Sequence, residues 1–591
     1  MAATGFESWP WVAGLGLLAI GGGIAAWLLF GRGSGKAKPV VFAAVPLLVL
    51  ALLVSGGLSP APANAANPCP PTPSAPSTPG APIATPEPTG SPVDYLPGAA
   101  GIGDAYFPLD GNGGYDVQHY ALDLGYDPAS GVLSGTAAIT AVATQNLSTF
   151  NLDFDTRDVD GTDAITVSAI TVDGEPADWS LASTQISADT GQPQVDGSTD
   201  ADATPPRTEL TVIPLSGIPA GATVTTVVAY SGVPIEIDDA YGLAGVFTTP
   251  TGAVIVGQPR VAATWFPAND HPSDKATFST RMTVPEGLQV IGNGRLASTT
   301  TAGGTSTFDW EMDEPMATYL ATATLGDYEV SSEPGADGIT YYDAIDPTLF
   351  SRDVRGAPGV KVGDVAKEIF GSEPEVIAFL STYFGAYPFD EAGGIAIGYI
   401  GEKTDPETGE TSPVDLEYAL ENQTRPIYPA WAFPEDADPA VVVHELAHQW
   451  YGDSLSMQRW SDIWLNEGFA TYAEWLWAES QGGPTTQEAF QDAYDSIPAG
   501  DSLWQTEVAD PGAAGIFDGA VYTRGAMTLQ ALRTEVGDPA FLSIIKGWAT
   551  EHAGTSVSTA QFVDYAESVS GRDLTAFFDT WIYSTGKPAL D

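Results

Sequence analysis

The spacing of apolar residues separates a β-rich half of the chain from a helix-rich half. From about residue 100 to residue 335, short alternations of apolar and polar residues are interrupted by turns rich in glycine, aspartate and proline. Examples are HYALDLGYD (119–127), LSGTAAITAVAT (133–144), TVTTVVAYSGV (223–233) and GLQVIGNGRL (287–296). Alternation of this kind, with so many turn signals, predicts an antiparallel β domain.

Beyond about residue 360, apolar residues recur every three or four positions over lengths that are typical of helices. The segments with this pattern are 360–371, 375–385, 438–452, 462–480, 520–536 and 573–584. The two halves together predict an α+β fold, with an N-terminal β domain over residues 99–335 and a mostly helical domain over residues 336–591.

Residues 1–65 contain two apolar runs, 11–30 and 39–58, each long enough to cross a hydrocarbon core of about 30 Å as a helix. The short loop between them is basic, which favours a cytoplasmic loop and an exported remainder. A second interpretation takes this loop and the second run as a signal peptide that is cleaved after Ala65. In both cases the rest of the chain is extracytoplasmic, either anchored to the membrane at the cell surface or secreted.

The composition adds three constraints. Residues 66–98 are rich in proline, serine and threonine, which predicts an extended linker. The single cysteine, Cys69, lies in this linker, so no intramolecular disulfide can form. The chain has 75 acidic and 21 basic side chains, for a net charge of −54. Such a charge favours solubility and excludes nucleic acid as a partner.

Two of the five histidines, His444 and His448, stand four positions apart in VVVHELAHQW (441–450). On a helix this spacing places both rings on one face, whether or not a metal is bound. The simple alternative is therefore an apolar helix that carries two imidazoles. The glutamate directly after the first histidine, in a chain with so few histidines, favours the HExxH zinc motif.

A catalytic zinc ion needs a third protein ligand and an open fourth position. Glu467, on the next predicted helix, is the candidate for the third ligand, because Cys69 is far away in the linker. The sequence thus predicts one Zn²⁺ per chain, held by His444, His448 and Glu467. Glu445 flanks the metal without binding it, which suits a general base that deprotonates the zinc-bound water.

The stretches HELAHQWYGD (444–453) and WLNEGFATYAE (464–474) resemble the aminopeptidase N family of gluzincin metallopeptidases. Further segments resemble the same family in the same order, namely 266–296, 314–330, 418–426 and 521–541. The resemblance implies an N-terminal β-saddle domain followed by a thermolysin-like catalytic domain. It also implies hydrolysis of the N-terminal peptide bond of extracellular peptides that have a free N-terminus.

The resemblance also implies roles for single residues. In YALENQTRP (418–426), Glu421 matches the exopeptidase motif, whose carboxylate binds the substrate's amine through a charge-assisted hydrogen bond, and Asn422 supports the substrate backbone. Gln258 falls where many relatives carry a second acid, and being neutral it offers only a hydrogen bond. Tyr522 matches the tyrosine whose hydroxyl stabilises the oxyanion of the tetrahedral intermediate. Arg524, where lysine is commoner, receives no role.

The chain departs from the family pattern in places. Tyr418 stands where the exopeptidase motif has glycine, which changes the shape of a subsite, and Leu420 stands where it has methionine. The end of the chain resembles the close of the catalytic domain. We therefore expect a short form without the C-terminal helical domain, with a more open cleft that admits larger peptides. Two alternatives remain, a thermolysin-like endopeptidase with the same zinc ligands and a catalytically silent surface protein that binds peptides.

Overall fold

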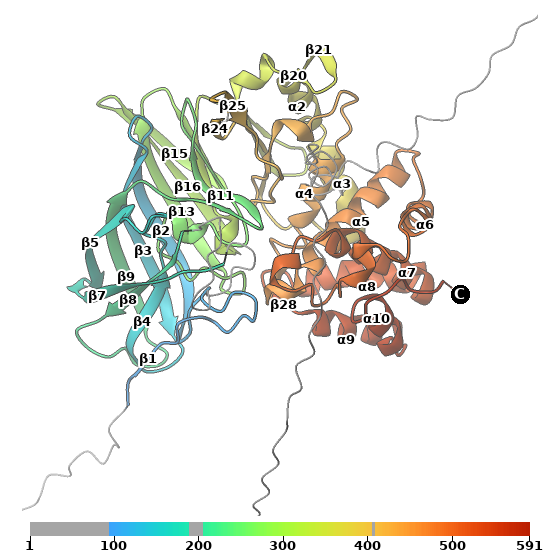
Figure 1. The fold of residues 1–591 in the computed structure, drawn as a ribbon, viewed down its shortest axis with the longest axis horizontal. Coiled ribbons are helices and arrows are strands. Elements are labelled where there is room, and N and C mark those ends of the chain that lie inside the picture. The colour runs from blue at the N-terminus through green and yellow to red at the C-terminus, as the bar shows by residue number, and fades with distance from the viewer. Residues whose placement is uncertain (1–93, 188–204, 405–407, 591) are drawn as a thin grey trace, which may run out of the picture. The chain divides into compact units, whose positions relative to one another are not determined.

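The computed structural model describes residues 94–187, 205–404 and 408–590. A β-rich N-terminal part is followed by a mostly helical C-terminal part, so the α+β class is confirmed (Figure 1). The predicted apolar segments (1–65), Cys69 and all but the end of the predicted linker (66–98) lie outside the described residues. Within the described ranges, no helix combines the length and the hydropathy needed to cross a membrane.

The largest sheet of the N-terminal part has eight strands in the order β15-β16-β13-β2-β3-β9-β5-β6. Along β2, buried and more exposed residues alternate, as expected for a strand with one face in the core. The strands of this sheet are β2 (Tyr115–Asp127), β3 (Val132–Ala143), β5 (Ile165–Val172), β6 (Glu175–Pro176), β9 (Thr223–Gly232), β13 (Ala276–Pro285), β15 (Arg295–Ala302) and β16 (Thr305–Met316).

This sheet is not wholly antiparallel, which corrects the sequence-based expectation. Strand β13 pairs with β2 in parallel, with Thr277 opposite His119 and Thr283 opposite Gly125. The two strands are separated by a long stretch of chain that forms other strands, so β13 returns to the free edge of β2 in the same direction. A parallel pair requires such a long crossover, whereas a hairpin can make only antiparallel pairs.

Two smaller sheets complete the N-terminal part. One has the order β1-β4-β8-β7 and the other the order β10-β11-β12-β17-β14. The strands are β1 (Leu96–Pro97), β4 (Leu147–Asp153), β7 (Asp178–Thr184), β8 (Arg207–Ile213), β10 (Glu236–Asp239), β11 (Gly242–Thr248), β12 (Ala253–Val256), β14 (Gln289–Gly292) and β17 (Ala323–Gly326).

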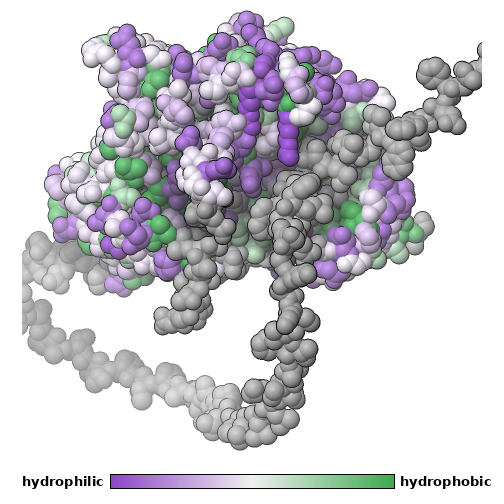
Figure 2. Space-filling model, turned by 45° about the horizontal axis from the view of Figure 1, so that its top comes forward, coloured by the Kyte–Doolittle hydropathy of each residue, from purple (hydrophilic) through white to green (hydrophobic). Residues whose placement is uncertain are grey.

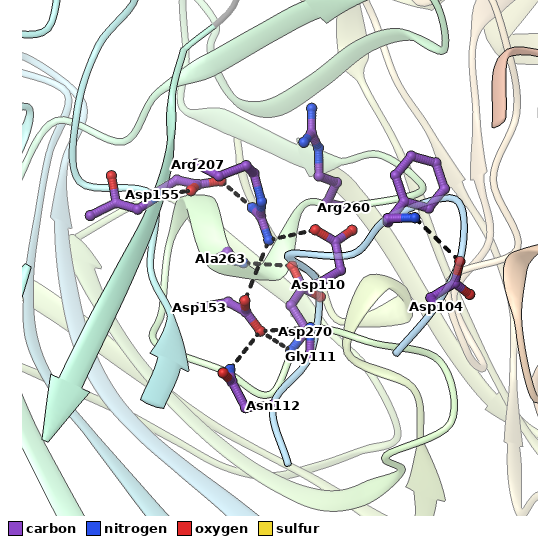
Figure 3. A network of polar contacts seen from close by, with 12 residues as sticks. Asp104, Asp110, Gly111, Asn112, Asp153, Asp155, Arg207, Arg260, Ala263 and Asp270 are labelled. Carbon is purple, nitrogen blue, oxygen red and sulfur yellow. Dashed lines mark hydrogen bonds and ion pairs between the residues drawn. The ribbon is translucent and has the colours of Figure 1, made fainter. Parts of the chain in front are cut away.

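A network of buried charges ties these strands together (Figure 3). The guanidinium of Arg207 lies 3.0 Å from Asp110 and 3.6 Å from Asp153, and it also pairs with Asp155. Asp153 accepts further hydrogen bonds from the backbone of Gly111 and Asp270. Because buried charges are costly unless they are paired, this network fixes the segment before β2 against β4 and β8.

The C-terminal part is built mainly from helices (Figure 1). They are α2 (Val362–Phe370), α3 (Glu373–Phe384), α4 (Ala440–His448), α5 (Trp464–Ser480), α6 (Thr486–Ser496), α7 (Gly525–Val536), α8 (Asp538–Glu551), α9 (Thr559–Ser570) and α10 (Thr575–Trp581). Each of the six predicted helical segments overlaps one of these helices, and five contain theirs entirely, whereas α3 begins two residues before its predicted segment. Helices α6, α8 and α9 are additional to the prediction.

A small sheet with the order β18-β19-β23-β26 belongs to this part, and β22 also pairs with β19. Strands β18 (Glu329–Pro334) and β19 (Thr340–Ile345) form a hairpin whose turn contains the predicted domain boundary at 335/336. The remaining strands are β20 (Asp353–Val354), β21 (Ala357–Lys361), β22 (Glu391–Ala392), β23 (Ile395–Ala396), β24 (Gly401–Thr404), β25 (Thr411–Val414), β26 (Ile427–Tyr428), β27 (Ser456–Met457) and β28 (Ser556–Val557).

The surface agrees with the composition. On the face shown in Figure 2, described residues are mostly hydrophilic or intermediate in hydropathy, and hydrophobic residues form small separate patches. The hydrophobic residues are instead concentrated in the core, where fully buried tryptophans include Trp265 and Trp310 in the N-terminal part and Trp464 and Trp548 in the C-terminal part.

Candidate active site

Helix α4 carries both histidines of the HExxH motif. Its residues from Val442 to His448 are all buried, so the helix runs through the interior of the helical part. The four-residue spacing places His444 and His448 one turn apart, with ring centroids 4.8 Å from each other. The two imidazoles therefore present their nitrogens to the same side of α4.

Glu467 reaches these imidazoles from the first turn of α5, where a carboxylate is favoured by the helix dipole. Its Oε2 atom lies 3.3 Å from Nε2 of His444 and 3.4 Å from Nε2 of His448. Burial alone would raise the pKa of Glu467. The charge of His448 and hydrogen bonds with both imidazoles outweigh it and hold this pKa below its usual range.

The other nitrogen of each imidazole is also held. Nδ1 of His448 lies 3.0 Å from the backbone oxygen of Tyr451, which can only accept, so this nitrogen carries the proton. Nδ1 of His444 lies 2.6 Å from Oε1 of Glu474, a residue on α5 that the sequence analysis did not single out. These contacts orient both rings so that both Nε2 atoms point toward Oε2 of Glu467, where a metal ion would be bound.

The three donors fit a zinc ion. Zinc bonds of about 2.0–2.1 Å at tetrahedral angles put neighbouring ligand atoms about 3.3 Å apart, and the measured Nε2 to Oε2 distances match this separation. All three side chains are buried, and their donor atoms lie within 4.8 Å of one another. Two neutral imidazoles, one carboxylate and an open fourth position form the ligand set of catalytic zinc sites.

Glu445 lies beside this set without being part of it. One of its carboxylate oxygens lies within 4.8 Å of a ring nitrogen of His448 and of a carboxylate oxygen of Glu421. Burial raises the pKa of Glu445 to about 8, against the opposing charges of His444 and His448. Because this carboxylate lies beside the metal ligands without being one of them, it is placed to accept a proton and then return it.

Glu421 stands on the loop between β25 and β26, next to Glu445. It is buried, and its Oε1 accepts a hydrogen bond of 2.8 Å from the hydroxyl of Tyr319. The neighbouring Asn422 is fully buried, and its side-chain nitrogen donates to the backbone oxygen of Leu320 over 3.0 Å. Glu421 therefore faces the metal-binding cluster, whereas the amide nitrogen of Asn422 ties the loop to the N-terminal part.

Tyr522 lies on a π-helical turn, η8 (Ala520–Arg524), that leads into α7. Its ring stacks on His444, with centroids 6.2 Å apart and planes 22° apart. Burial and the carboxylates of Glu467, Glu421 and Glu445 raise its pKa, so the phenol remains protonated and can donate a hydrogen bond. Single π-helical turns within helices occur frequently at functional sites.

Arg524, at the end of the same turn, has a structural role that the sequence did not reveal. It is fully buried and donates to the backbone oxygens of Thr506, Thr580 and Ser584 over 3.2, 3.2 and 2.6 Å. Thr580 lies in the last turn of α10 and Ser584 three residues beyond its end, and a cation is favourable at the C-terminus of a helix. Arg524 thereby anchors the turn that carries Tyr522.

Gln258 is less closely connected to the site. It follows β12, and its buried Oε1 has no hydrogen-bond partner among the described residues. No hydrogen bond or ion pair joins it to the metal ligands in the described ranges, so its role stays a prediction. Tyr418, the departure from the exopeptidase motif, donates its hydroxyl hydrogen bond to the backbone oxygen of Leu243 in β11. Its phenol is thus fixed to the N-terminal part.

Comparison with protein families places this geometry in a known group. The model of the peptidase M1 N-terminal domain matches residues 116–320, and the model of the peptidase family M1 domain matches residues 435–581. The chain belongs to the M1 peptidase family. The zinc ligands His444, His448 and Glu467 all lie within the second match, and the family expected from the sequence is confirmed.

Individual M1 proteins are similar at moderate identity. Aminopeptidase N of Streptomyces lividans is 27% identical over 334 residues, which are 55% of this chain and 36% of that protein. The chain thus spans about a third of the length of the curated relatives that it matches.

Solved structures match over more of their length. The M1 zinc metallopeptidase of Deinococcus radiodurans is 26% identical to this chain, and the two structures match with a TM-score of 0.65. The matched region covers 83% of this chain and 98% of that protein. A variant of that enzyme bound to the substrate Tyr-Ser-Ala matches with the same identity and TM-score, over 83% and 99% of the two chains.

Proposed function

We propose that this protein is a zinc aminopeptidase, which hydrolyses the N-terminal peptide bond of peptides that have a free amino terminus. The observation that carries the proposal is the position of Glu421, a buried carboxylate within 4.8 Å of Glu445 and His448. An anionic group beside the metal ligands can bind a protonated amine, and a bound amine leaves only the first peptide bond within reach of the metal.

His444, His448 and Glu467 would hold a zinc ion, which would act as a Lewis acid that polarises a carbonyl group and lowers the pKa of water. The chain's own residues do the rest. Glu445 accepts a proton from the attacking water and returns it to the leaving amine. Tyr522 donates a hydrogen bond to the developing oxyanion, and Glu421, with Gln258 as a neutral second contact, holds the substrate's amine.

The substrate class follows from the same site. The Deinococcus radiodurans variant binds a tripeptide, Tyr-Ser-Ala, and the matched region of this chain covers nearly all of that protein. We therefore infer that short peptides are substrates of this chain too. We also infer that its β-rich part corresponds to the family's β-saddle domain and its helical part to the thermolysin-like domain, in line with the two family matches.

The decisive experiment compares aminoacyl p-nitroanilides with their N-acetylated forms, using purified full-length protein of known zinc content. An aminopeptidase hydrolyses the free form and leaves the acetylated form intact. Equal turnover of both forms would instead identify a thermolysin-like endopeptidase. Absence of turnover of either form, with one zinc ion bound per chain, would identify a peptide-binding surface protein.

We also propose that the enzyme works outside the cytoplasm. The support is the sequence alone, with apolar runs at 11–30 and 39–58 and a basic loop between them. Membrane fractionation combined with protease treatment of intact cells tests the orientation. N-terminal sequencing of the mature protein then distinguishes a retained anchor from cleavage after Ala65, and recovery of intact chain in the cytosol would contradict both.

A further inference from the structure

Glu421 is nearly fully buried, with 2% of its surface exposed, and a carboxylate in such a place is costly unless hydrogen bonds compensate. Tyr319 is the one described side chain that hydrogen-bonds to the carboxylate of Glu421. Tyr319 is itself buried, at 1% exposure, in the short helix η2 (Thr318–Leu320) at the end of the N-terminal part. The group that serves the proposed amine site is thus 102 residues away in sequence.

The backbone around Glu421 is held from the same side. Leu320, next to Tyr319, accepts hydrogen bonds at its backbone oxygen from the side chains of Asn422 and Asn293, over 3.0 and 2.9 Å. Asn293 also donates to the backbone oxygen of Gln423 over 2.8 Å. The loop that carries Glu421 is therefore attached to the N-terminal part at successive residues.

From the other side, Gln449 at the end of α4 connects the loop to the zinc-binding helix. Its Oε1 accepts from the backbone nitrogen of Thr424 over 2.7 Å, and its Nε2 donates to the backbone oxygen of Glu421 over 3.3 Å. Thr424 has a φ of 63°, a left-handed conformation that is unfavourable for threonine. Such a conformation persists where surrounding contacts hold it.

We propose that Tyr319 is a positioning residue for amine recognition. Its hydroxyl donates a hydrogen bond to Oε1 of Glu421 and thereby directs Oε2 toward the substrate's ammonium group. This inference rests on the proposed aminopeptidase function. It assigns part of the exopeptidase specificity to the N-terminal part of the chain, which supplies no metal ligand. Among the described residues, no hydrogen bond joins Tyr319 to the metal-binding side chains. Its effect on amine binding therefore passes through Glu421.

The test is Tyr319→Phe, which removes the hydroxyl and keeps the ring. We expect KM for a free aminoacyl p-nitroanilide to rise about tenfold or more, as for the loss of one hydrogen bond to a charged group, with a smaller change in kcat. Zinc content should remain at one ion per chain. Tyr428→Phe is the matched control, because the hydroxyl of Tyr428 is buried without a hydrogen-bond partner among the described residues.

Two inhibitors separate a positioning role from a general structural one. The hydroxamate of an amino acid contains the α-amine, whereas its des-amino analogue does not. In Tyr319→Phe, Ki should rise for the first and stay unchanged for the second. In a Glu421→Gln background, Tyr319→Phe should have little further effect, because the two residues act as one unit.

Unchanged KM and Ki in a folded Tyr319→Phe protein would overturn the inference, as would an equal rise in Ki for both inhibitors. If Tyr319→Phe does not fold, Tyr319→Gln and Tyr319→Leu replace it, since only glutamine keeps an N–H donor and should retain the lower KM. Equal KM for those two would also overturn it. A wild-type enzyme that cleaves acetylated substrates equally well refutes the proposed function itself, which is a separate outcome.

Discussion

Oε1 of Glu474 lies 2.6 Å from Nδ1 of His444, so a second carboxylate of α5 supports the imidazole that Glu467 faces on its other side. Such carboxylate–histidine contacts fix the ring and raise its basicity as a ligand. We predict that Glu474→Gln folds normally but binds zinc about 10–100-fold more weakly, the usual loss for such a partner.

The measurement for Glu474→Gln is a competition titration of zinc against a chelator of known affinity, followed by activity at saturating zinc. Asp492→Asn, at an exposed position of α6, serves as the control. Zinc affinity equal to that of the wild type would show that the His444–Glu474 contact has no influence on the metal.

Glu445→Gln tests the proton-transfer role. Glutamine has nearly the same size as glutamate but cannot accept a proton, so zinc should still bind while turnover falls by about 10²–10⁴-fold. Zinc analysis and steady-state kinetics on the same preparation check both statements. Wild-type turnover in a zinc-loaded Glu445→Gln protein would assign the base to another residue.

Tyr522→Phe tests the oxyanion contact. Removing one preorganised donor typically lowers kcat by about 10²–10³-fold, and KM should change little because the hydroxyl acts mainly in the transition state. The control is Tyr494→Phe, on α6, whose hydroxyl donates to the backbone of Pro588. A Tyr522→Phe effect confined to KM would show that the phenol binds substrate instead.

The metal site could be predicted from the sequence because its geometry is local to two helices. His444 and His448 share a face of α4 through their four-residue spacing, and Glu467 opens the next long apolar helix. Glu474 was missed, although its position two helical turns after Glu467 on the same face of α5 is a signal that could have identified it.

Other features depend on contacts between distant residues. The hydrogen bond from Tyr319 to Glu421 and the parallel pairing of β2 with β13 join segments far apart in the chain, and no local pattern encodes either. Helices α6 and α9 are different, because both begin with capping boxes, Thr485 with Glu488 and Ser558 with Gln561. Those signals are present in the sequence even where the apolar periodicity is weak.

The charge network of the N-terminal part predicts an unusual pH dependence of stability. Glu209 in β8 stands directly opposite Asp153 in β4, and burial raises the pKa of Glu209 to about 7 despite the nearby charge of Arg207. Because the folded state holds this proton more tightly than the unfolded state, the stabilisation is complete below about pH 4.5 and is lost as the pH rises through about 7.

Glu209→Gln removes this titration and a negative charge that lies near the carboxylates of Asp155 and Asp110. We predict that the variant is more stable than the wild type at pH 8, by about 1–3 kcal/mol, and that the advantage shrinks toward pH 5, where Glu209 is protonated in the wild-type fold. Thermal unfolding at pH 5, 6, 7 and 8 measures the difference. Glu175→Gln, at an exposed position of β6, is the control. A constant difference between variant and wild type across this range would mean that Glu209 does not titrate in it, and that its charge is compensated within the fold.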